Sequence, residues 1–409
     1  MQRALAAALI CKGESILNNT GISIDSQVAK NIIQNLGAVV TDISSTSKQI
    51  MSEGFPHVFF PPGKKIQIFC GESGLSTRMF APIASLCTNE IILTGEEQLT
   101  KRPMDFFDTY FPLLNIKIKS ENGKLPIVLQ GPLIPKNIDI DCSEGSQYLT
   151  GLLMAYSAVN ANDVMINVKN LKSPGYIRLT LDIMKKFGMQ LPVYTNFSSF
   201  YFDGKLNNHL PKKRIYTIES DWSNSAFLFI ASAIAGQVCL NELDMSSEQP
   251  DKIILQILEN CGALISYKKN SIEISKSNLR AFQYDATDTP DLFPPLAALA
   301  ACCSGTSTIG GVHRLTHKES NRSEAILKEL KKMNIPVQII HDQMIIQGTG
   351  SIQSARIESH GDHRIAMMCS ILALVADGET IIDQAEVVGK SYPHFFRDLQ
   401  SLGAAISIH

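Results

Sequence analysis

Two cations lie where the sequence predicts the start of a helix. Lys318 and Arg322 come just ahead of an amphipathic stretch, residues 323–333, whose apolar side chains recur at three- and four-residue spacing. Asn321, with Glu324 three residues later, resembles a capping box at this helix start. A helix N-terminus already carries about half a positive charge, so cations there are unfavourable unless an anion binds at the same corner. A solvated charged turn is the alternative interpretation.

Four further predicted helix starts carry cations in the same way. Pro103, which follows Arg102, is a residue type favoured at the first helical position. The other three cationic starts are Arg3 before residues 4–10, His363 and Arg364 before residues 365–376, and Lys390 before residues 395–399. If the five starts converge in the fold, they form a pocket for a ligand that carries several negative charges.

The composition sets the class of protein. The 409 residues are enough for two or three domains with sizeable cores. A formal net charge of −2 argues against nonspecific nucleic-acid binding, so the cations are a local concentration on a nearly neutral protein. The nine cysteines show no metal-ligand spacing, which favours core thiols in a reducing cytoplasm. No apolar run approaches the ~20 residues that a membrane-spanning helix needs, and we interpret residues 1–10 as a core helix.

Six predicted helices end in an apolar residue followed by Gly or Asn, the residue types that cap helices in the left-handed conformation. These ends lie about 70 to 80 residues apart, which suits a multi-element α/β unit and is too long for a solenoid repeat. Six such units predict two domains of three units each, residues 1–217 and residues 218–409. The ends are Leu36-Gly37, Leu114-Asn115, Phe187-Gly188, Cys261-Gly262, Met333-Asn334 and Leu402-Gly403.

Short stretches of alternating apolar and polar residues lie between these helices and predict half-buried strands. The predicted strands are residues 116–119, 138–141, 164–168, 271–274, 337–340 and 344–346, with a hairpin turn at residues 341–343. Strands mixed with amphipathic helices favour an α/β fold whose sheets are covered on one face.

A glycine-bearing turn, residues 71–78, precedes a helix predicted over residues 79–87. Glycine lets backbone N–H groups approach an anion closely. The turn is not a P-loop, because no Gly-Lys-Ser or Gly-Lys-Thr follows it. Taken alone, it predicts no more than an ordinary turn.

Eight stretches extend in order over nearly the whole chain: residues 71–78, 101–104, 145–149, 173–176, 289–291, 318–322, 361–367 and 390–393. The most specific are Lys-Glu-Ser-x-Arg at residues 318–322 and Asp-His-Arg-x-Ala-Met at residues 362–367. Together they resemble the EPSP synthase family, the 3-phosphoshikimate 1-carboxyvinyltransferases.

The resemblance implies two domains that form a two-domain inside-out α/β barrel, each with three βαβαββ units, and an active site in the cleft between them. It implies transfer of the enolpyruvyl group of phosphoenolpyruvate to the 5-hydroxyl of shikimate 3-phosphate, with release of phosphate, on the way to chorismate and the aromatic amino acids. Both substrates carry a phosphate and a carboxylate, which suits cationic helix starts. We therefore expect no cofactor, no metal, no nucleic-acid or membrane partner, and a cytoplasmic monomer.

The resemblance also implies roles for individual residues. Asp291 would accept the proton of the 5-hydroxyl group, and Lys318 and Glu319 would move protons to and from the methylene carbon. Surrounding cations would lower the pKa of Lys318. Substrate binding would fall to Arg3, Ser146, Ser173 and Tyr176 for shikimate 3-phosphate, to Gly74, Arg102, Gln147 and Lys390 for phosphoenolpyruvate, and to Arg322 and Arg364 for its carboxylate, with His363 orienting its neighbours.

Two of these positions, and one further residue, also have a purely structural interpretation. Asp291 could cap a helix beside Pro290, and Tyr176 could be a core aromatic residue. Asp25 fits a family position and equally fits the N-cap of a helix over residues 26–36.

Two other functions stay open. In the family, a strand and a Ser-Lys-Ser motif precede the position that matches Arg3, whereas this sequence starts at Met1. Because the lysine of that motif would touch both substrates, one alternative is an inactive or truncated homologue that binds anionic ligands without turnover. The other is the transferase that acts on UDP-N-acetylglucosamine, which would carry a reactive loop cysteine that is not obvious among the nine here.

Overall fold

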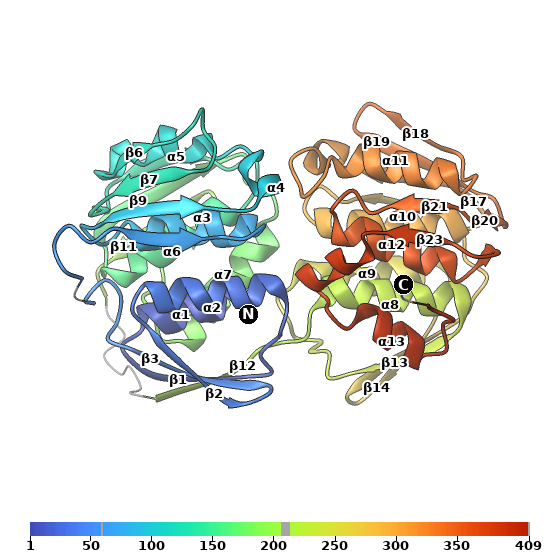
Figure 1. Cartoon of the computed structure of the whole chain (residues 1–409), viewed down its shortest axis with the longest axis horizontal. Helices are drawn as coiled ribbons and strands as arrows, with labels where there is room; N and C mark the ends of the chain where they lie inside the picture. The colour runs from blue at the N-terminus through green and yellow to red at the C-terminus, as the bar shows by residue number, and fades with distance from the viewer. Residues whose placement is uncertain (59, 206–212, 408–409) are drawn as a thin grey trace. The chain divides into compact units, whose positions relative to one another are not determined.

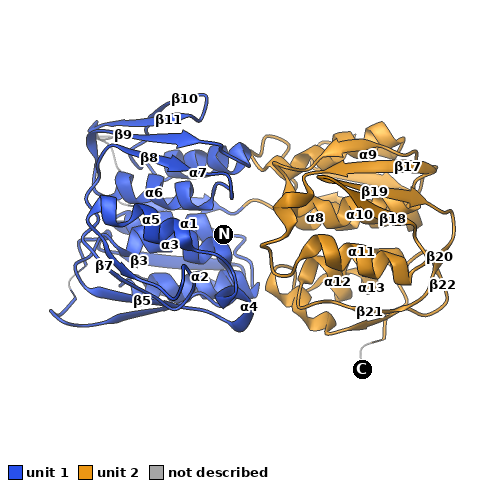
Figure 2. Ribbon diagram, turned by 90° about the horizontal axis from the view of Figure 1, so that it is seen from above, with its two compact units in different colours: residues 1–218 blue, residues 219–409 orange. Residues whose placement is uncertain are grey.

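Helices and strands alternate along the whole of the computed structural model, which describes residues 1–58, 60–205 and 213–407 (Figure 1). The chain divides into two compact units, unit 1 (residues 1–218) and unit 2 (residues 219–409) (Figure 2). The predicted α/β class is confirmed. Among the described residues, no helix is long and apolar enough to cross a membrane.

A repeat of strand, helix, strand, helix, strand and strand builds two sheets of unit 1. In one copy the strands lie in the order β4-β5-β7-β6, with β4 parallel to β5 and the other neighbours antiparallel. The second copy, in the order β8-β9-β11-β10, has the same directions. The elements are β4 (Ile66–Phe69), α3 (Gly74–Ala84), β5 (Glu90–Thr94), α4 (Glu97–Thr100), α5 (Asp105–Tyr110), η1 (Pro112–Leu114), β6 (Lys117–Lys119) and β7 (Ile127–Gln130), then β8 (Ile138–Asp141), α6 (Gln147–Ala158), β9 (Asn162–Lys169), α7 (Pro174–Lys186), β10 (Val193–Thr195) and β11 (Ser199–Asp203).

Another sheet of unit 1 joins strands from the two ends of the unit. It has the order β12-β1-β3-β2, and β12 runs parallel to β1 with Lys213 opposite Glu14. A strand from the end of the unit therefore takes the place that β4 and β8 have in their own sheets. The elements are α1 (Gln2–Ile10), β1 (Gly13–Asn18), α2 (Ile24–Asn35), β2 (Val39–Ser44), β3 (Ser47–Ser52) and β12 (Lys213–Thr217).

Unit 2 contains a third copy of the repeat, with strand order β16-β17-β19-β18 and the same directions. It also has a three-stranded sheet, β13-β15-β14, and two parallel pairs, β20-β22 and β21-β23. The elements are α8 (Trp222–Ala235), β13 (Gln237–Asn241), η2 (Pro250–Ile253), α9 (Ile254–Cys261), β14 (Leu264–Lys268), β15 (Ser271–Ser275), β16 (Gln283–Asp285), η3 (Pro290–Leu292), α10 (Phe293–Cys302), β17 (Gly305–Gly310), η4 (Val312–Leu315), α11 (Arg322–Lys332), β18 (Val337–Ile340), β19 (Gln343–Gly348), β20 (Ile352–Gln353), β21 (Arg356–Glu358), α12 (His363–Ala373), β22 (Ala376–Asp377), β23 (Ile381–Asp383), η5 (Ala385–Lys390) and α13 (Phe395–Ser401).

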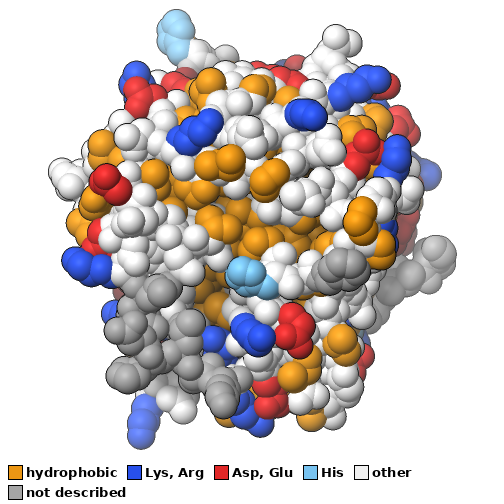
Figure 3. Space-filling view, turned by 90° about the vertical axis from the view of Figure 1, so that its left-hand side faces the viewer, with side chains coloured by type: hydrophobic (Ala, Val, Ile, Leu, Met, Phe, Trp, Pro, Cys, Tyr) orange, Lys and Arg blue, Asp and Glu red, His pale blue; other side chains and the backbone are white. Residues whose placement is uncertain are grey.

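Apolar helices form the centre of each unit, and the sheets lie around them (Figure 2). Helices α1 and α10 are buried along almost their whole length, because helices that are apolar on all sides have no face suited to solvent. The strands alternate instead: Ile138 and Ile140 of β8 are buried and Asp139 is exposed. The outer surface keeps some apolar side chains, and Figure 3 shows a group of them with charged side chains around it. This is the inside-out arrangement that the resemblance implied.

The six predicted left-handed helix caps are confirmed, because each of these residues has a positive φ. Their φ angles are 98° at Gly37, 67° at Asn115, 75° at Gly188, 90° at Gly262, 59° at Asn334 and 102° at Gly403. The predicted strands at residues 138–141 and 337–340 coincide with β8 and β18.

Several predicted helix starts were wrong. Pro103 lies outside α5, whose N-cap is Met104. Helix α2 begins one residue before Asp25, and Ser23 is its N-cap. Helix α3 begins at Gly74 rather than at residue 79, so the glycine-bearing turn runs into its first turn. Asn321 is the N-cap of α11, but its side chain makes no capping hydrogen bond, so the capping box does not form.

Candidate active site

Arg322, the first residue of α11, lies at the centre of a buried group of charges in unit 2. Only 1% of its side chain is exposed. Its Nε donates to Asp362 Oδ2 at 2.8 Å, Nη1 to Asp291 Oδ1 at 3.1 Å, and Nη2 to Glu319 Oε2 at 2.5 Å. Burial opposes the charged guanidinium, but these three carboxylates outweigh it and raise the pKa of Arg322. Carboxylates of the chain itself thus lie at the helix start where the sequence predicted a bound anion.

Asp291, in η3, is a carboxylate held between three cations. Lys318 Nζ lies 3.7 Å from its Oδ1, and Arg364 Nη2 lies 3.4 Å from its Oδ2. Burial would raise the pKa of Asp291, but Arg364, Lys318 and Arg322 together hold it well below the usual range. Thr289, not Asp291, is the N-cap of η3. Asp291 is therefore an ionised carboxylate, the form that can accept a proton.

Glu319 connects Arg322 to a third segment of unit 2. Lys390 Nζ, at the end of η5, donates to Glu319 Oε1 at 2.9 Å. The other carboxylate oxygen of Glu319 accepts from Arg322. The loop before α11, the start of α11 and the end of η5 therefore meet through charge-assisted hydrogen bonds, which are stronger than neutral ones.

Lys318 keeps some access to solvent, with 19% of its side chain exposed. Burial lowers the pKa of Lys318 to about 8, although Asp291 and Glu319 favour the charged ammonium. The predicted direction of this shift agrees with the structure, and the cations Arg322 and Arg314 contribute to it as predicted, but burial is the larger cause. An amine with a pKa near neutral pH can both donate and accept a proton.

The start of α12 is fixed by its N-cap, Asp362, which is fully buried. Asp362 Oδ1 accepts from the backbone N–H of Arg364 at 3.0 Å, and Oδ2 accepts from Ser320 Oγ at 3.1 Å. Arg364 Nη2 in turn donates to Ser223 Oγ, at the start of α8, at 3.1 Å. Burial lowers the pKa of His363 to about 3 despite the neighbouring Asp362, so this imidazole stays neutral near pH 7.

In unit 1, Arg3 of α1 lies against the first turns of α7. Its Nε donates to Thr180 Oγ1 at 3.0 Å, and its guanidinium carbon lies 5.9 Å from the centre of the Tyr176 ring. Burial lowers the pKa of Arg3 to about 10, so it remains a cation at neutral pH. Tyr176 is half-buried rather than enclosed in the core. Ser173, the N-cap of α7, has a φ of 60°.

A second pair in unit 1 consists of Gly74 and Arg102. A methyl group on Gly74 would lie 2.9 Å from Arg102 Nη2, closer than such a contact allows. Glycine at this position therefore lets the guanidinium lie directly on the start of α3. Nearby in the sequence, Arg78 Nη1 donates to Gln147 Oε1 at 2.9 Å, and Ser146 is the N-cap of α6.

The structure brings six predicted residues into one charged group of unit 2, with His363 directly beside Asp362. They are Asp291, Lys318, Glu319, Arg322, Arg364 and Lys390. The predicted residues of unit 1 form smaller groups at the starts of α1, α3, α6 and α7: Arg3 with Tyr176, Gly74 with Arg102, and Ser146 with Gln147, while Ser173 begins α7.

Three residues that contact predicted site residues, one in unit 1 and two in unit 2, were given no role from the sequence. Asp362 is the first residue of the motif at residues 362–367. Its position next to His363 and Arg364 could have indicated a role in the site. Arg78 ends the glycine-bearing turn and binds Gln147. Ser223 lies two residues after Asp221, and its hydroxyl donates to Asp221 Oδ1 at 2.7 Å. No local pattern in the sequence links Ser223 to Arg364.

The chain is similar to one family over almost all of its length. The family model described as EPSP synthase (3-phosphoshikimate 1-carboxyvinyltransferase) matches residues 1–399. The 3-phosphoshikimate 1-carboxyvinyltransferase of Clostridium novyi (strain NT) is 31% identical over 407 residues, which cover 99% of this chain and 93% of that protein. The protein of the same name from Clostridium perfringens (strain 13 / Type A) is 33% identical over 405 residues, with coverage of 99% and 93%.

Solved structures share the fold. The EPSP synthase from Acinetobacter baumannii has a TM-score of 0.80 at 23% identity and covers 99% of this chain, which covers 94% of that one. The enolpyruvyl transferase NikO from Streptomyces tendae has a TM-score of 0.76 at 14% identity, with coverage of 99% and 93%. At these identities the likeness shows the fold alone.

Proposed function

Because the chain belongs to the EPSP synthase family, we propose that it transfers the enolpyruvyl group of phosphoenolpyruvate to the 5-hydroxyl of shikimate 3-phosphate and releases phosphate. One observation in the structure supports this most strongly. The ionised carboxylate of Asp291 and the ammonium of Lys318, whose pKa is about 8, lie 3.7 Å apart. A base and an acid this close together can act on the same pair of bound substrates, the base on the 5-hydroxyl group and the acid on the methylene carbon.

The first half of the reaction is an addition. The 5-hydroxyl oxygen forms a bond to the central carbon of phosphoenolpyruvate, and Asp291 takes the hydroxyl proton. Lys318 gives a proton to the methylene carbon, which becomes a methyl group. Burial makes Lys318 a readier proton donor, and three cations keep Asp291 ionised although burial opposes its charge.

The second half is an elimination. The bond from the central carbon to the phosphate oxygen breaks, and phosphate leaves with the bonding electrons. The methyl group loses a proton and the carbon–carbon double bond forms again. Glu319 is the proposed acceptor of that proton, and its hydrogen bonds with Arg322 and Lys390 fix the position of its carboxylate.

Binding of the two acidic substrates is assigned to the cations. We propose that Arg3, Ser146, Ser173 and Tyr176 hold shikimate 3-phosphate, and that Gly74, Arg102, Gln147 and Lys390 hold the phosphate of phosphoenolpyruvate. Arg364 and Arg322 would pair with its carboxylate. Since Arg322 already pairs with three carboxylates of the chain, its part would include holding Asp291 and Glu319 in place.

We also propose a cytoplasmic location and no requirement for a cofactor. The nine cysteines are free thiols in the structure, and most are buried, which is the state expected in a reducing compartment.

Phosphate release tests the proposal directly. Purified protein mixed with phosphoenolpyruvate and shikimate 3-phosphate should release phosphate continuously, whereas either substrate alone should release none. Heat stabilisation by both substrates without phosphate release would instead indicate an anion-binding protein without turnover. Release that requires UDP-N-acetylglucosamine in place of shikimate 3-phosphate would indicate the other transferase.

A further inference from the structure

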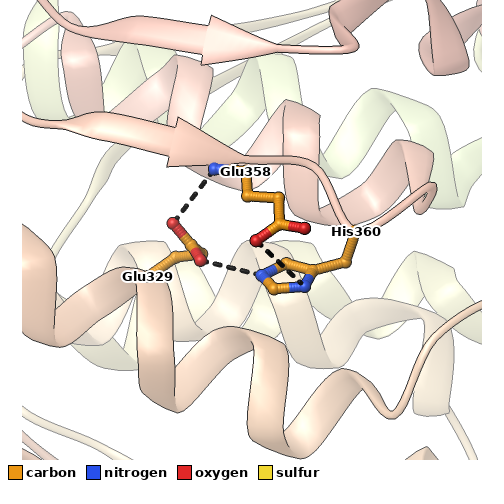
Figure 4. A group of neighbouring side chains, drawn as sticks. All are labelled: Glu329, Glu358 and His360. Carbon is orange, nitrogen blue, oxygen red and sulfur yellow. Dashed lines mark hydrogen bonds and ion pairs between the residues drawn. The ribbon is translucent and has the colours of Figure 1, made fainter.

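Glu329 lies on α11 two turns after Arg322, and none of its side chain is exposed. Its Oε2 accepts from Lys332 Nζ at 2.7 Å. Figure 4 shows its two other contacts: Oε2 accepts from the backbone N–H of Glu358 at 3.2 Å, and Oε1 lies 2.8 Å from His360 Nε2. A buried carboxylate is tolerated only where partners of this kind balance its charge. The proposed reaction does not use Glu329.

His360 is part of a tight turn formed by residues 359–362. The backbone N–H of Asp362 donates to the carbonyl of Ser359 at 2.9 Å. The two central residues, His360 and Gly361, have φ angles of 56° and 65°, the signs expected for a type I′ turn. Glycine adopts this conformation freely, but a residue with a side chain does not. The bond from His360 to Glu329 therefore holds the chain in a conformation that it would otherwise resist.

The turn leads directly into the charged group. Its last residue, Asp362, accepts from Arg322 and caps the helix that begins with His363 and Arg364. Helix α11 thus contacts the turn at two points. Arg322 binds Asp362, and Glu329, seven residues later, binds His360. Arg322, Glu329 and Asp362 are buried and 19% of the His360 side chain is exposed, and the two bonds fix the turn against the helix.

We propose that Glu329 is a positioning residue of the active site. With His360 it fixes the turn that presents Asp362 to Arg322 and sets the start of α12 with Arg364. This inference rests on the proposed function, because the loss of Glu329 should weaken binding of phosphoenolpyruvate at Arg322 and Arg364.

The same side chains could also be considered as metal ligands. Ligand atoms of Glu329, Glu358 and His360 lie within 4.8 Å of one another. However, both carboxylates already have lysine partners, Lys332 at 2.7 Å from Glu329 and Lys328 at 2.8 Å from Glu358. Two ammonium groups beside the site would repel a divalent cation. The charges therefore favour a positioning role over a metal site.

Two variants test the inference, and a third variant serves as the control. Glu329→Gln removes the charge, and His360→Gly removes the imidazole while glycine keeps the positive φ that the turn needs. In each, KM for phosphoenolpyruvate should rise about fivefold or more while kcat changes less. The double variant should be no worse than the more impaired single variant, because both changes disrupt the same contact between Glu329 and His360. Lys328→Gln, in an exposed ion pair of the same helix, should behave like the wild type.

A second measurement does not depend on turnover. Hydrogen exchange of the amides at residues 359–364, without substrate, should be about tenfold faster in Glu329→Gln and in His360→Gly than in the wild type. If an active wild type and both variants share the same KM and the same exchange rates, the inference is wrong. If the wild type releases no phosphate, the proposed function fails, and the exchange rates alone decide whether Glu329 fixes the turn. If the wild type binds Zn²⁺ and Glu358→Gln does not, these side chains form a metal site and the positioning role is wrong.

Discussion

Arg322 and Asp362 form an ion pair that is shut off from solvent, with Arg322 Nε 2.8 Å from Asp362 Oδ2. The two residues come from the starts of different helices, and each start also carries residues assigned to the reaction. The pair therefore joins Lys318 and Glu319, ahead of α11, to Arg364 at the start of α12.

Asp362→Asn should destabilise unit 2 and weaken binding of phosphoenolpyruvate. Removing one partner of a buried ion pair costs roughly 3 to 5 kcal/mol, and the lower value is expected because Arg322 keeps Glu319 and Asp291. Urea denaturation measures this change. Asp383→Asn is the matched control, because it breaks an exposed Arg–Asp pair with Arg356 and should leave the midpoint nearly unchanged. An unchanged midpoint in Asp362→Asn would contradict the role given to the pair.

Lys318→Met should abolish phosphate release and at the same time stabilise the protein. The fall of the Lys318 pKa from 10.5 to about 8 means that the charged amine destabilises the native state below pH 8, by roughly 1 to 3 kcal/mol. Wild-type stability should therefore rise between pH 8 and pH 10, and the variant should lack that rise. Thermal unfolding at several pH values measures it. Lys331→Met changes an exposed lysine of α11 and should alter neither phosphate release nor stability.

His363→Gln should make the protein less sensitive to mild acid. Above pH 6.5 the imidazole is neutral whether the chain is folded or unfolded, so it contributes no pH dependence there. Between pH 6.5 and about 3, the unfolded chain binds a proton that the native state cannot, and stability falls by about 1.4 kcal/mol per pH unit. Denaturation at pH 6 and pH 4 should show a smaller loss in the variant. The exposed His57→Gln variant should match the wild type.

Gly74→Ala should preserve the fold and weaken phosphoenolpyruvate binding. The new methyl group would lie 2.9 Å from Arg102 Nη2, so the flexible guanidinium must move. Alanine is also the better helix former, although at this first position of α3 the gain is less than the about 1 kcal/mol of a helix interior, so the protein should unfold no earlier than the wild type. Steady-state kinetics should give a KM for phosphoenolpyruvate roughly threefold or more above that of the wild type. A wild-type KM would show that Arg102 does not contact this substrate.

Local signals in the sequence predicted much of the backbone. The caps at Gly37, Asn115 and Gly262 were found because left-handed conformations favour Gly and Asn whatever surrounds them. The start of α5 was misplaced because Pro103 is favoured at a first helical position but is not confined to it.

The charge balance of the site could not be read from local patterns. Lysines and arginines at helix starts suggested an empty anion site, yet Arg322 meets Asp291 and Asp362, which are 31 and 40 residues away in the sequence. The importance of Asp362 depends on the packing of α11 against α12, which spacing within either helix does not reveal. The low pKa of Lys318 likewise follows from burial in the folded chain.

The parallel pairing of β12 with β1 has a consequence for biosynthesis. Lys213 lies opposite Glu14, so about 200 residues must be made between the two partners. During translation, the first half of the protein cannot complete this sheet until residue 217 has emerged from the ribosome. Until then β1 has an unsatisfied edge, which other chains or a chaperone could bind.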